Sequence, residues 1–478
     1  MITVVVLVAL IAAVVLVPLP KWLADPASGG DSATVKPVSQ TDLTYYCPAR
    51  MALSDNGKYG DAAFQPSEGN VTSSARYGAF GSVYQATVGA VTNGSEADEQ
   101  KLKGDDTVDG ATVKTYSGSV DKGSTAFETH LLTAKSGTGA AASVASWASE
   151  GDLKGLSAST CVTPALEQDF LLGPTTTGAT QQLSVANFSS KPTSLQIRIW
   201  STKYGTPLQL STGNILNVGA NGEATQELSA SAPGNEALFV SVTSKETPIA
   251  AVVRSVELNG LSAVGSDYAV PLQSSAKRQY LPGLSGGDGV KVLARARRST
   301  DLSLSWVNGQ GTTQAKTQHL DAGKVSVVDL GQAPQDAIGL QASAGEPIDV
   351  AAKVTRSVGS DTDFTYVGPA KASARSAVVL PDHTDGVLAL MNISDQPVKA
   401  TLQGYDASGK PAGNMDIEIA GNAAVNVKAG DVDANAVMFV LKNGKNVAMG
   451  TRLIESGRTN PSRLHWPISP LRGWNRKP

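Results

Sequence analysis

The central and C-terminal parts of the chain alternate hydrophobic and polar positions with a period of two. Clear examples are LQIRI at 195–199 and LFVSV at 238–242. Because successive side chains of a strand point to opposite faces, each run predicts a strand that buries one face. Segments rich in Asn, Gly, Asp and Pro separate the runs, and these residues favour turns. The pattern therefore predicts many short strands joined by tight turns.

The order of the runs recurs about every 100 residues. Each repeat ends on an apolar run with an arginine, and these are Arg254, Arg356 and Arg452. A second marker is TDLTYYCPAR at 41–50, which shares six of ten positions with TDFTYVGPAK at 362–371. SDYAVP at 266–271 is a weaker copy. We interpret these copies as the starts of units, with acidic residues at matching positions, namely Asp42, Asp267 and Asp363.

These markers divide the chain into units. We predict a divergent β unit at 41–160 and three β-sandwich units at 161–265, 266–361 and 362–457. About seven runs per unit, with turn signals every 8–12 residues, are typical of an immunoglobulin-like sandwich. We therefore expect an all-β chain of tandem immunoglobulin-like β-sandwich units. A propeller with two blades per repeat is the alternative, although no half-repeat is visible in the sequence.

The N-terminal segment is strongly apolar. Residues 2–17 form sixteen positions without a charge, slightly fewer than the roughly 20 that span a bilayer. Residues 1–20 predict a hydrophobic helix, either a signal-peptide core or a signal anchor, and the poor cleavage motif favours a retained anchor. Both interpretations require a preceding basic residue, so we expect the natural start to lie upstream of Met1. Residues 21–40, rich in Ser, Gly, Pro and Ala, predict a flexible linker.

The chain has two cysteines, Cys47 and Cys161. An even count behind an export signal predicts one disulfide. By the repeat alignment, the bond would join the first strands of two neighbouring units. Closing a loop between positions 114 residues apart contributes about 4–5 kcal/mol in the chain-entropy model. Two buried thiols that do not react with each other are the alternative.

Charges of both signs occur along the chain, with 14 acidic and 9 basic residues at 41–160 and a basic C-terminal end. The net charge is −3, and no folded segment is basic enough to suggest nucleic-acid binding. Residues 458–478 form a basic Trp/Pro tail, and tryptophan and arginine both bind well to lipid head groups. The tail predicts contact with anionic envelope polymers or lipids, unless Trp466 docks onto a sandwich. The candidate contact residues are Arg458, Arg463, Trp466, Arg472, Trp474, Arg476 and Lys477.

Catalytic motifs are weak. GLSGG at 283–287 matches a nucleophile elbow around Ser285, but that motif requires a following helix, and the next run predicts a strand. GTGAAA at 137–142 lacks the strand and helix context of a dinucleotide site. Glu150 and Asp152 are carboxylate candidates for a glycan hydrolase, but the sequence does not pair them. We therefore assign no catalytic residues.

Motifs for metal and anion sites are weak as well. None of the four histidines, His130, His319, His383 and His465, lies at ligand spacing from another. PDHTDG at 381–386 predicts a solvated turn, with a weak cation site around Asp382 and Asp385 as the alternative. The acidic run at 95–110 lacks the order of a calcium loop. The recurring arginines predict pairing at strand ends, or else a line of guanidinium groups for an anionic polymer. We expect no metal and no cofactor.

Two stretches carry a family resemblance. SEGDLKGLSASTCVTP at 149–164 and GPTTTGATQQLSVANFSSKPTSLQIRIW at 173–200 resemble a family of uncharacterised extracytoplasmic proteins of actinobacteria. The likeness covers most of 41–457 and rests on a cysteine, a Gly-Leu turn and strand patterns. The resemblance implies location and domain type, and the family brings no catalytic residues with it.

These observations favour a non-enzymatic, envelope-tethered repeat protein with a structural, adhesive or binding role outside the membrane. The expected partners are the membrane, through the N-terminal helix, and an envelope protein or polysaccharide. The alternative is a secreted hydrolase acting on cell-envelope glycans, which needs two carboxylates facing each other in a cleft. Cleavage of the N-terminal helix would make the protein secreted rather than anchored.

Overall fold

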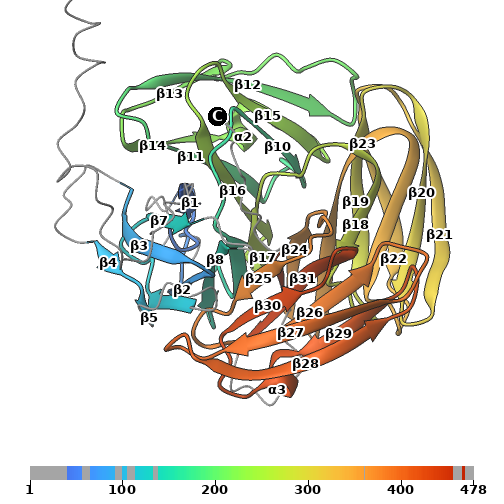
Figure 1. Cartoon of the computed structure of the whole chain (residues 1–478). Coiled ribbons are helices and arrows are strands. Elements are labelled where there is room, and N and C mark those ends of the chain that lie inside the picture. Colours follow the sequence, from blue (N-terminus) through green and yellow to red (C-terminus); the bar gives the residue numbers. More distant parts are fainter. Residues whose placement is uncertain are drawn as a thin grey trace, which may run out of the picture. The chain divides into compact units, whose positions relative to one another are not determined.

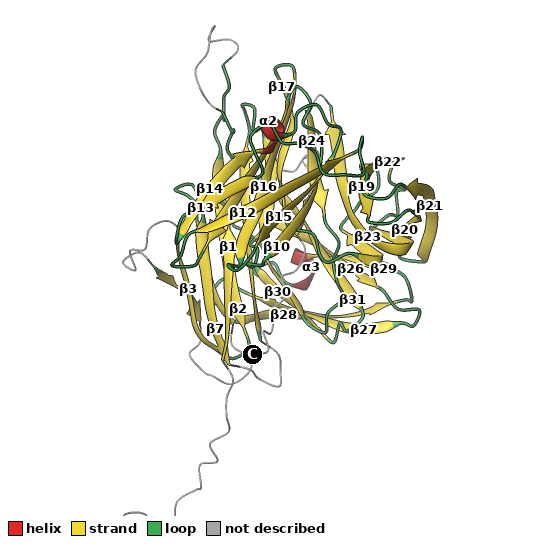
Figure 2. Cartoon of the chain, turned by 90° about the horizontal axis from the view of Figure 1, so that it is seen from above, coloured by secondary structure: helices red, strands yellow, loops and turns green. Residues whose placement is uncertain are grey.

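The computed structural model describes residues 40–55, 65–91, 99–104, 113–132, 138–359, 361–455 and 466–468. The hydrophobic helix and linker expected at 1–40 lie almost wholly outside these residues. Among the described residues, no helix has the length and apolar character needed to cross a membrane. The described chain is all-β, with two helices of four residues each, α2 (Leu228–Ser231) and α3 (Ala429–Val432), as Figure 2 shows.

The strands fall into four consecutive units. The first contains β1 (Gln40–Cys47), β2 (Thr72–Phe80), β3 (Val83–Ala90), β4 (Gln100–Lys101), β5 (Lys103–Gly104), β6 (Val113–Gly118), β7 (Thr125–Leu132), β8 (Gly139–Ala148) and β9 (Gly155–Thr160). The second contains β10 (Glu167–Leu172), β11 (Ala179–Asn187), β12 (Thr193–Ser201), β13 (Ile215–Val218), β14 (Gly222–Glu227), β15 (Leu238–Ser244), β16 (Ile249–Asn259) and β17 (Ser262–Ala269).

The third unit contains β18 (Ala276–Pro282), β19 (Gly289–Ala296), β20 (Thr300–Asn308), β21 (Gly311–Leu320), β22 (Val325–Gln332), β23 (Gly339–Val358) and β24 (Asp361–Val367). The fourth contains β25 (Ser376–Val379), β26 (Thr384–Asn392), β27 (Val398–Tyr405), β28 (Pro411–Ile419), β29 (Ala424–Lys428), β30 (Met438–Lys442), β31 (Val447–Glu455) and β32 (Trp466–Ile468).

All four units share one topology of two antiparallel sheets, here called sheet I and sheet II. In the fourth unit sheet I has the order β25-β30-β27-β28 and sheet II the order β29-β26-β31-β32. The second unit repeats these orders, and so does the first, with β5 added beside β6. In the third unit the 20-residue strand β23 serves both sheets, because its first part pairs with β18 and β20 and its second part with β19 and β24. The divergent first unit is therefore a true repeat.

Each unit buries its core between its two sheets. In the fourth unit Leu388 and Met449 of sheet II and Leu402 and Phe439 of sheet I belong to one cluster without solvent exposure. The alternation predicted from sequence is confirmed on β12, where exposed and buried positions alternate along the strand. Burying apolar surface between two sheets is the main stabilising contribution to such a unit.

The strand order agrees only in part with the immunoglobulin arrangement. As in that arrangement, the second strand of the second and fourth units pairs with the fifth and the third with the sixth, and the first unit has the same pairs once its extra strand β5 is left out of the count. The terminal strands differ, because the first strand pairs with the sixth and the seventh pairs with the second. An immunoglobulin domain has its first strand beside the second and its last beside the sixth.

The unit boundaries lie later in the chain than the sequence markers suggested. SDYAVP lies largely in β17, which pairs with β16, and TDFTYV lies in β24, which pairs with β23. Both segments therefore close a unit instead of opening the next. TDLTYYC forms β1, a first strand paired with β7. The two similar decapeptides thus occupy different positions in their units. Their sequences are alike because each forms a largely buried strand with an acidic residue near its start.

The last strands of the four units meet in the centre of the molecule. β17 lies beside β9 and β24, and β32 lies beside β24 and β9. Figure 1 shows the four groups of strands around β17 and β24. Apolar clusters fill the contacts between consecutive units, and a further cluster joins the first unit to the fourth through Phe80, Val113, Tyr405 and Met438. The four units thus form a closed ring.

The cysteines form the predicted disulfide, with a Cα–Cα distance of 4.3 Å between Cys47 and Cys161. Cys47 ends β1, and Cys161 follows β9 directly. Both side chains are fully buried in the core of the first unit. The bond therefore joins the two ends of the first unit and does not link the first strands of two units. The repeat alignment misplaced Cys161, because β10 begins only at Glu167.

The C-terminal tail contributes a strand. Residues 466–468 form β32 and pair with residues 451–453 of β31. This strand has the position in the fourth unit that β9, β17 and β24 have in theirs. The other candidate contact residues of the tail, at 458, 463, 472, 474, 476 and 477, lie outside the described residues.

Candidate functional site

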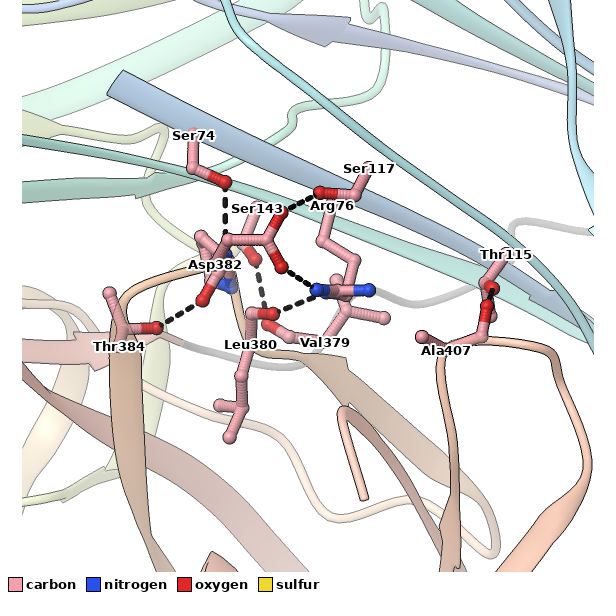
Figure 3. A network of polar contacts seen from close by, with 11 residues as sticks. Ser74, Arg76, Thr115, Ser117, Ser143, Val379, Leu380, Asp382, Thr384 and Ala407 are labelled. Carbon is pink, nitrogen blue, oxygen red and sulfur yellow. Dashed lines mark hydrogen bonds and ion pairs between the residues drawn. The ribbon is translucent and has the colours of Figure 1, made fainter. Parts of the chain in front are cut away.

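A polar network joins the first unit to the fourth (Figure 3). The guanidinium of Arg76 on β2 donates to the carbonyl of Leu380 at 2.6 Å and forms an ion pair with Asp382. Ser117 also donates to the Asp382 carboxylate, and Ser143 donates to the carbonyl of Val379 at 2.7 Å. Burial lowers the pKa of Arg76, although Asp382 acts in the opposite direction. The network thus closes the ring of units with a charge-assisted contact.

The PDHTDG turn is accordingly part of this contact. The carboxylate of Asp382 pairs with Arg76 and accepts from Ser117, and its side chain is 46% exposed. His383 adopts a left-handed φ of 64°, and its ring lies 5.6 Å from that of Trp147. No group of three or more acidic, histidine or cysteine side chains suited to a metal ion occurs among the described residues. The segment forms a turn at residues 382–383, and this turn contacts the first unit.

The GLSGG loop carries a buried charge cluster at the junction of the third and fourth units. Asp288, directly after the motif, is 1% exposed and pairs with Arg356 at 2.7 Å and with Arg452 at 3.2 Å. The backbone amide of Ser285 donates to the same carboxylate at 2.8 Å. A strand, not a helix, follows the loop, so Ser285 does not lie on a nucleophile elbow. Burial lowers the pKa of Arg452 to about 10.

Two of the three recurring arginines therefore converge on one carboxylate. Arg356 belongs to β23 of the third unit and Arg452 to β31 of the fourth. Arg452 is 4% exposed, and so it is not part of an accessible line of guanidinium groups. Arg254 is half-buried on β16, and its Nε is a buried donor without an acceptor among the described residues. The interpretation as structural pairing fits Arg356 and Arg452.

Two of the recurring aspartates lie at the centre of the ring. Asp267 on β17 accepts bonds from the Ala158 amide at 3.1 Å, the Tyr366 amide at 3.0 Å and the Thr365 hydroxyl at 2.7 Å. Asp363 on β24 accepts from the Leu156 amide at 3.2 Å. These bonds join last strands of three different units. Asp42 differs, because it is exposed on β1 and lies 2.6 Å from His130.

Two glycines make room for the central carboxylate. A Cβ on either Gly155 or Gly265 would lie 2.3 Å from a carboxylate oxygen of Asp363. Both glycines also have φ values, 138° and 144°, that other residues rarely adopt. A side chain at either position would push the carboxylate away from its backbone donors.

Burial gives the central aspartates an unusual pH response. Desolvation raises the pKa of Asp267 to about 7 and that of Asp363 well above its ordinary value. A carboxyl with a raised pKa in the folded state stabilises the fold below the unfolded pKa, and this contribution is lost as pH rises through the folded pKa. We predict that ionisation of Asp267 lowers the free energy of unfolding of wild type by about 2–4 kcal/mol between about pH 4 and pH 7. The variant Asp267→Asn should not show this decrease.

The measurement is chemical denaturation at several pH values. Between these pH values the free energy of unfolding should fall more for wild type than for Asp267→Asn. Asp385 is exposed, so Asp385→Asn should show the same pH dependence as wild type. Parallel pH profiles for wild type and Asp267→Asn would contradict the prediction, whatever the absolute stability of the variant.

A second carboxylate group lies between the second and third units. Asp349 is 5% exposed, lies 3.8 Å from Arg295 and accepts from Ser275 at 2.6 Å. Desolvation, which outweighs the hydrogen bond from Ser241, raises the pKa of nearby Asp169 to about 6. The guanidinium of Arg295 lies 4.4 Å from the ring of Trp200. Asp349 is thus enclosed by its own partners and has little access for a substrate.

A polar groove of about 490 Å³ lies between the third and fourth units. The third unit contributes Arg278, Thr312 and Gln341, and the fourth contributes Ser394, Asp395 and Asn422. Neither Arg278 nor Asp395 has an ion-pair partner within the described part of the chain. Its lining of charged, amide and hydroxyl groups is suited to binding a small polar ligand.

The remaining candidates have ordinary surroundings. His319 is exposed and lies 2.7 Å from Asp301. Asp152 accepts from the Ser67 amide at 2.9 Å in an exposed turn, and Glu150 is exposed in the same turn. The GTGAAA stretch runs into β8 and so forms no phosphate loop in its described part. His465 and most of the acidic run at 95–110 lie outside the described residues.

Sequence reasoning missed Asp288, Arg76 and the groove. Arg76 and Asp382 are 306 positions apart, and no local pattern joins them. Asp288 had a weak signal, because it follows a loop with three glycines and precedes a predicted strand. The groove had none, since its two walls come from different units.

Comparison with known proteins bears on identity but not on activity. A comparison with curated proteins finds no match. A family model described as a family of unknown function, DUF5719, matches residues 117–430. This match spans the end of the first unit, the whole second and third units and most of the fourth. The chain therefore belongs to the DUF5719 family.

Proposed function

We propose that the protein is a non-enzymatic, envelope-tethered repeat protein with a structural or binding role outside the membrane. The observation that carries the proposal is the disulfide between Cys47 and Cys161, because such bonds persist in oxidising compartments. The apolar segment at 2–17 supplies the membrane tether. The units are variants of the immunoglobulin-like sandwich with exchanged terminal strands, and the resemblance to actinobacterial extracytoplasmic proteins supports the same location.

The distribution of polar groups supports binding over catalysis. The buried charges of the ring are held by partners in neighbouring units, as Arg76 is by Asp382 and Arg452 by Asp288. Such groups fix the units and do not face a substrate. In the groove between the third and fourth units, by contrast, charged groups from both units stay available. The basic tail provides a further contact with anionic envelope polymers.

The experiment is cosedimentation of the full chain with envelope fractions. We expect the wild-type chain to sediment with the envelope and to lose part of this binding when Arg472, Arg476 and Lys477 are replaced with glutamine. These three positions follow β32 in the sequence and lie outside the described residues. Recovery of the chain in the cytosolic fraction, with free thiols, would contradict the proposal.

A secreted hydrolase acting on cell-envelope glycans is the second candidate, favoured by the carboxyl of Asp169, whose Oδ1 is buried without a hydrogen-bond partner among the described residues. The raised pKa of Asp169, about 6, suits a general acid. Release of reducing ends from envelope glycans by wild type, lost in Asp169→Asn, would establish the enzyme. Equal release by both proteins, or none, would exclude Asp169 from such a role.

A further inference from the structure

The groove between the third and fourth units differs from the other contacts between units. At other contacts some charged side chains pair across the boundary, as Lys353 does with Glu257 and Lys154 with Asp361 at 2.8 Å. In the groove, Arg278 and Asp395 line the same space from opposite units and do not pair. A cation and an anion that face one space without meeting leave room for a ligand with both charges.

We propose that this groove binds a small zwitterion, such as an amino acid or a short peptide. Its carboxylate contacts the guanidinium of Arg278, and its ammonium group contacts the carboxylate of Asp395. This inference rests on the proposed binding role and names the class of ligand. A guanidinium suits a carboxylate because its planar donors bind both oxygens.

The wall from the third unit is the outer face of sheet I. Arg278 on β18 pairs in register with Ser343 of β23, and Gln341 of β23 pairs with Tyr280. The intervening Leu281, Leu340 and Ala342 are buried in the core of the unit. Since side chains alternate along a strand, Arg278 and Gln341 project from the opposite face, toward the fourth unit. Arg278 thus lies on a strand that pairs with β23, next to an irregularity in the register between Ala276 and Arg278.

The wall from the fourth unit consists of two interlocked turns. The Asn392 side chain donates to the carbonyls of Gln396 at 2.7 Å and Ala420 at 3.0 Å, and it accepts from the Ser394 amide at 3.0 Å. Asn422 has a left-handed φ of 53°, and its amide donates to the Ser394 carbonyl at 2.7 Å. Asp395 is therefore presented by a turn that is fixed at both ends.

The second unit has the same pair of turns without the acid. Asn187 donates to the carbonyls of Lys191 and Gly219 and accepts from the Ser189 amide at 2.9 Å. Its sequence NFSSKP aligns with NISDQP of the fourth unit, so Ser190 stands where the fourth unit has Asp395. The turn needs only the asparagine and the following serine. The carboxylate of Asp395 is thus an addition that the turn does not require.

The composition of the groove favours a zwitterion over a neutral sugar. Its lining includes no aromatic ring on which a sugar face would stack. The amides of Gln341 and Asn422 and the hydroxyls of Thr312 and Ser394 are suited to the polar backbone of a short peptide. A volume of about 490 Å³ is in the range of sites for small molecules.

The test is titration of the full chain with alanylalanine, in LL and DD forms, by calorimetry or ligand-observed NMR. We expect binding of at least one form, and at least tenfold weaker binding after Arg278→Gln or Asp395→Asn. Capping the ligand separates the two contacts. The C-terminal amide should bind wild type at least tenfold more weakly, but it should bind Arg278→Gln as well as the free dipeptide does. The N-acetylated dipeptide should likewise bind wild type at least tenfold more weakly than the free dipeptide, but it should bind Asp395→Asn as well as the free dipeptide does.

Matched controls are Lys277→Gln, an exposed neighbour on β18, and Asp385→Asn, an exposed acid of the fourth unit. Both should bind like wild type. The absence of dipeptide binding at millimolar concentration would overturn the inference. Equal binding by wild type, Arg278→Gln and Asp395→Asn, or tighter binding of a disaccharide than of the dipeptide, would also overturn it. If envelope cosedimentation persists in that case, the proposed function stands and only the ligand class is wrong.

Discussion

Asp288→Asn is expected to lower the free energy of unfolding by about 3–5 kcal/mol, because removing one partner of a buried ion pair leaves an uncompensated charge. The Asp288 carboxylate, 1% exposed, is shared by Arg356 and Arg452. Asparagine keeps the size of the side chain and an acceptor for the Ser285 amide. The expected loss therefore comes from the charge and not from a cavity.

Denaturant-induced unfolding provides the measurement, with Glu418→Gln as the control. Glu418 pairs with Lys399 at 3.6 Å, but both side chains are largely exposed, so its loss should change stability by less than about 1 kcal/mol. Arg452→Met in the Asp288→Asn background should recover part of the loss, since it removes a buried cation. A loss below about 1 kcal/mol for Asp288→Asn would show that solvent or relaxation compensates the charge.

The all-β fold was predictable because it is a local property of the sequence. On β12 the apolar residues occupy every second position, which is enough to predict a strand with one buried face, and the structure confirms the alternation. The repeat length was also visible, since each unit needs a similar number of residues to form two facing sheets. The disulfide followed from the cysteine count and the signs of export.

The unit boundaries were not predictable from the same signals. A strand such as β24 has an apolar, half-buried pattern whether it pairs with the preceding β23 or with a following strand. The choice depends on backbone pairing between segments whose side chains look alike. The long β23, which serves two sheets, also removes the turn that separates the sixth and seventh strands in the second and fourth units.

The polar sites were hidden for a related reason. Arg76 and Asp382 come from different units and meet only when the ring closes, and Arg278 and Asp395 line one groove for the same reason. The recurring arginines were visible in the sequence, but their partner Asp288 lies outside the repeated motif. Charges that pair within one strand or turn can be found by spacing, whereas charges that pair between units need the arrangement of the units.

Removal of the disulfide is the other change with a large expected effect. Because Cys47 and Cys161 are 114 residues apart, the Cys47→Ala/Cys161→Ala variant should lose about 4–5 kcal/mol in the chain-entropy model, with 2–5 kcal/mol typical of native disulfides. Alanine avoids placing a hydroxyl group in a core where both sulfur atoms are fully buried. The first unit should suffer most, since the bond joins its two ends.

The comparison of oxidised and reduced protein separates the bond from the packing of its atoms. Wild type in denaturant with a thiol reductant should unfold at nearly the midpoint of the double-alanine variant, whereas the variant itself should not respond to the reductant. Intact mass under non-reducing conditions should be two hydrogens lower for wild type than after reduction. The wild-type midpoint could instead stay unchanged although the disulfide is completely reduced. That result would mean that strand pairing between β1 and β7 and the core of the first unit stabilise this unit without the covalent link.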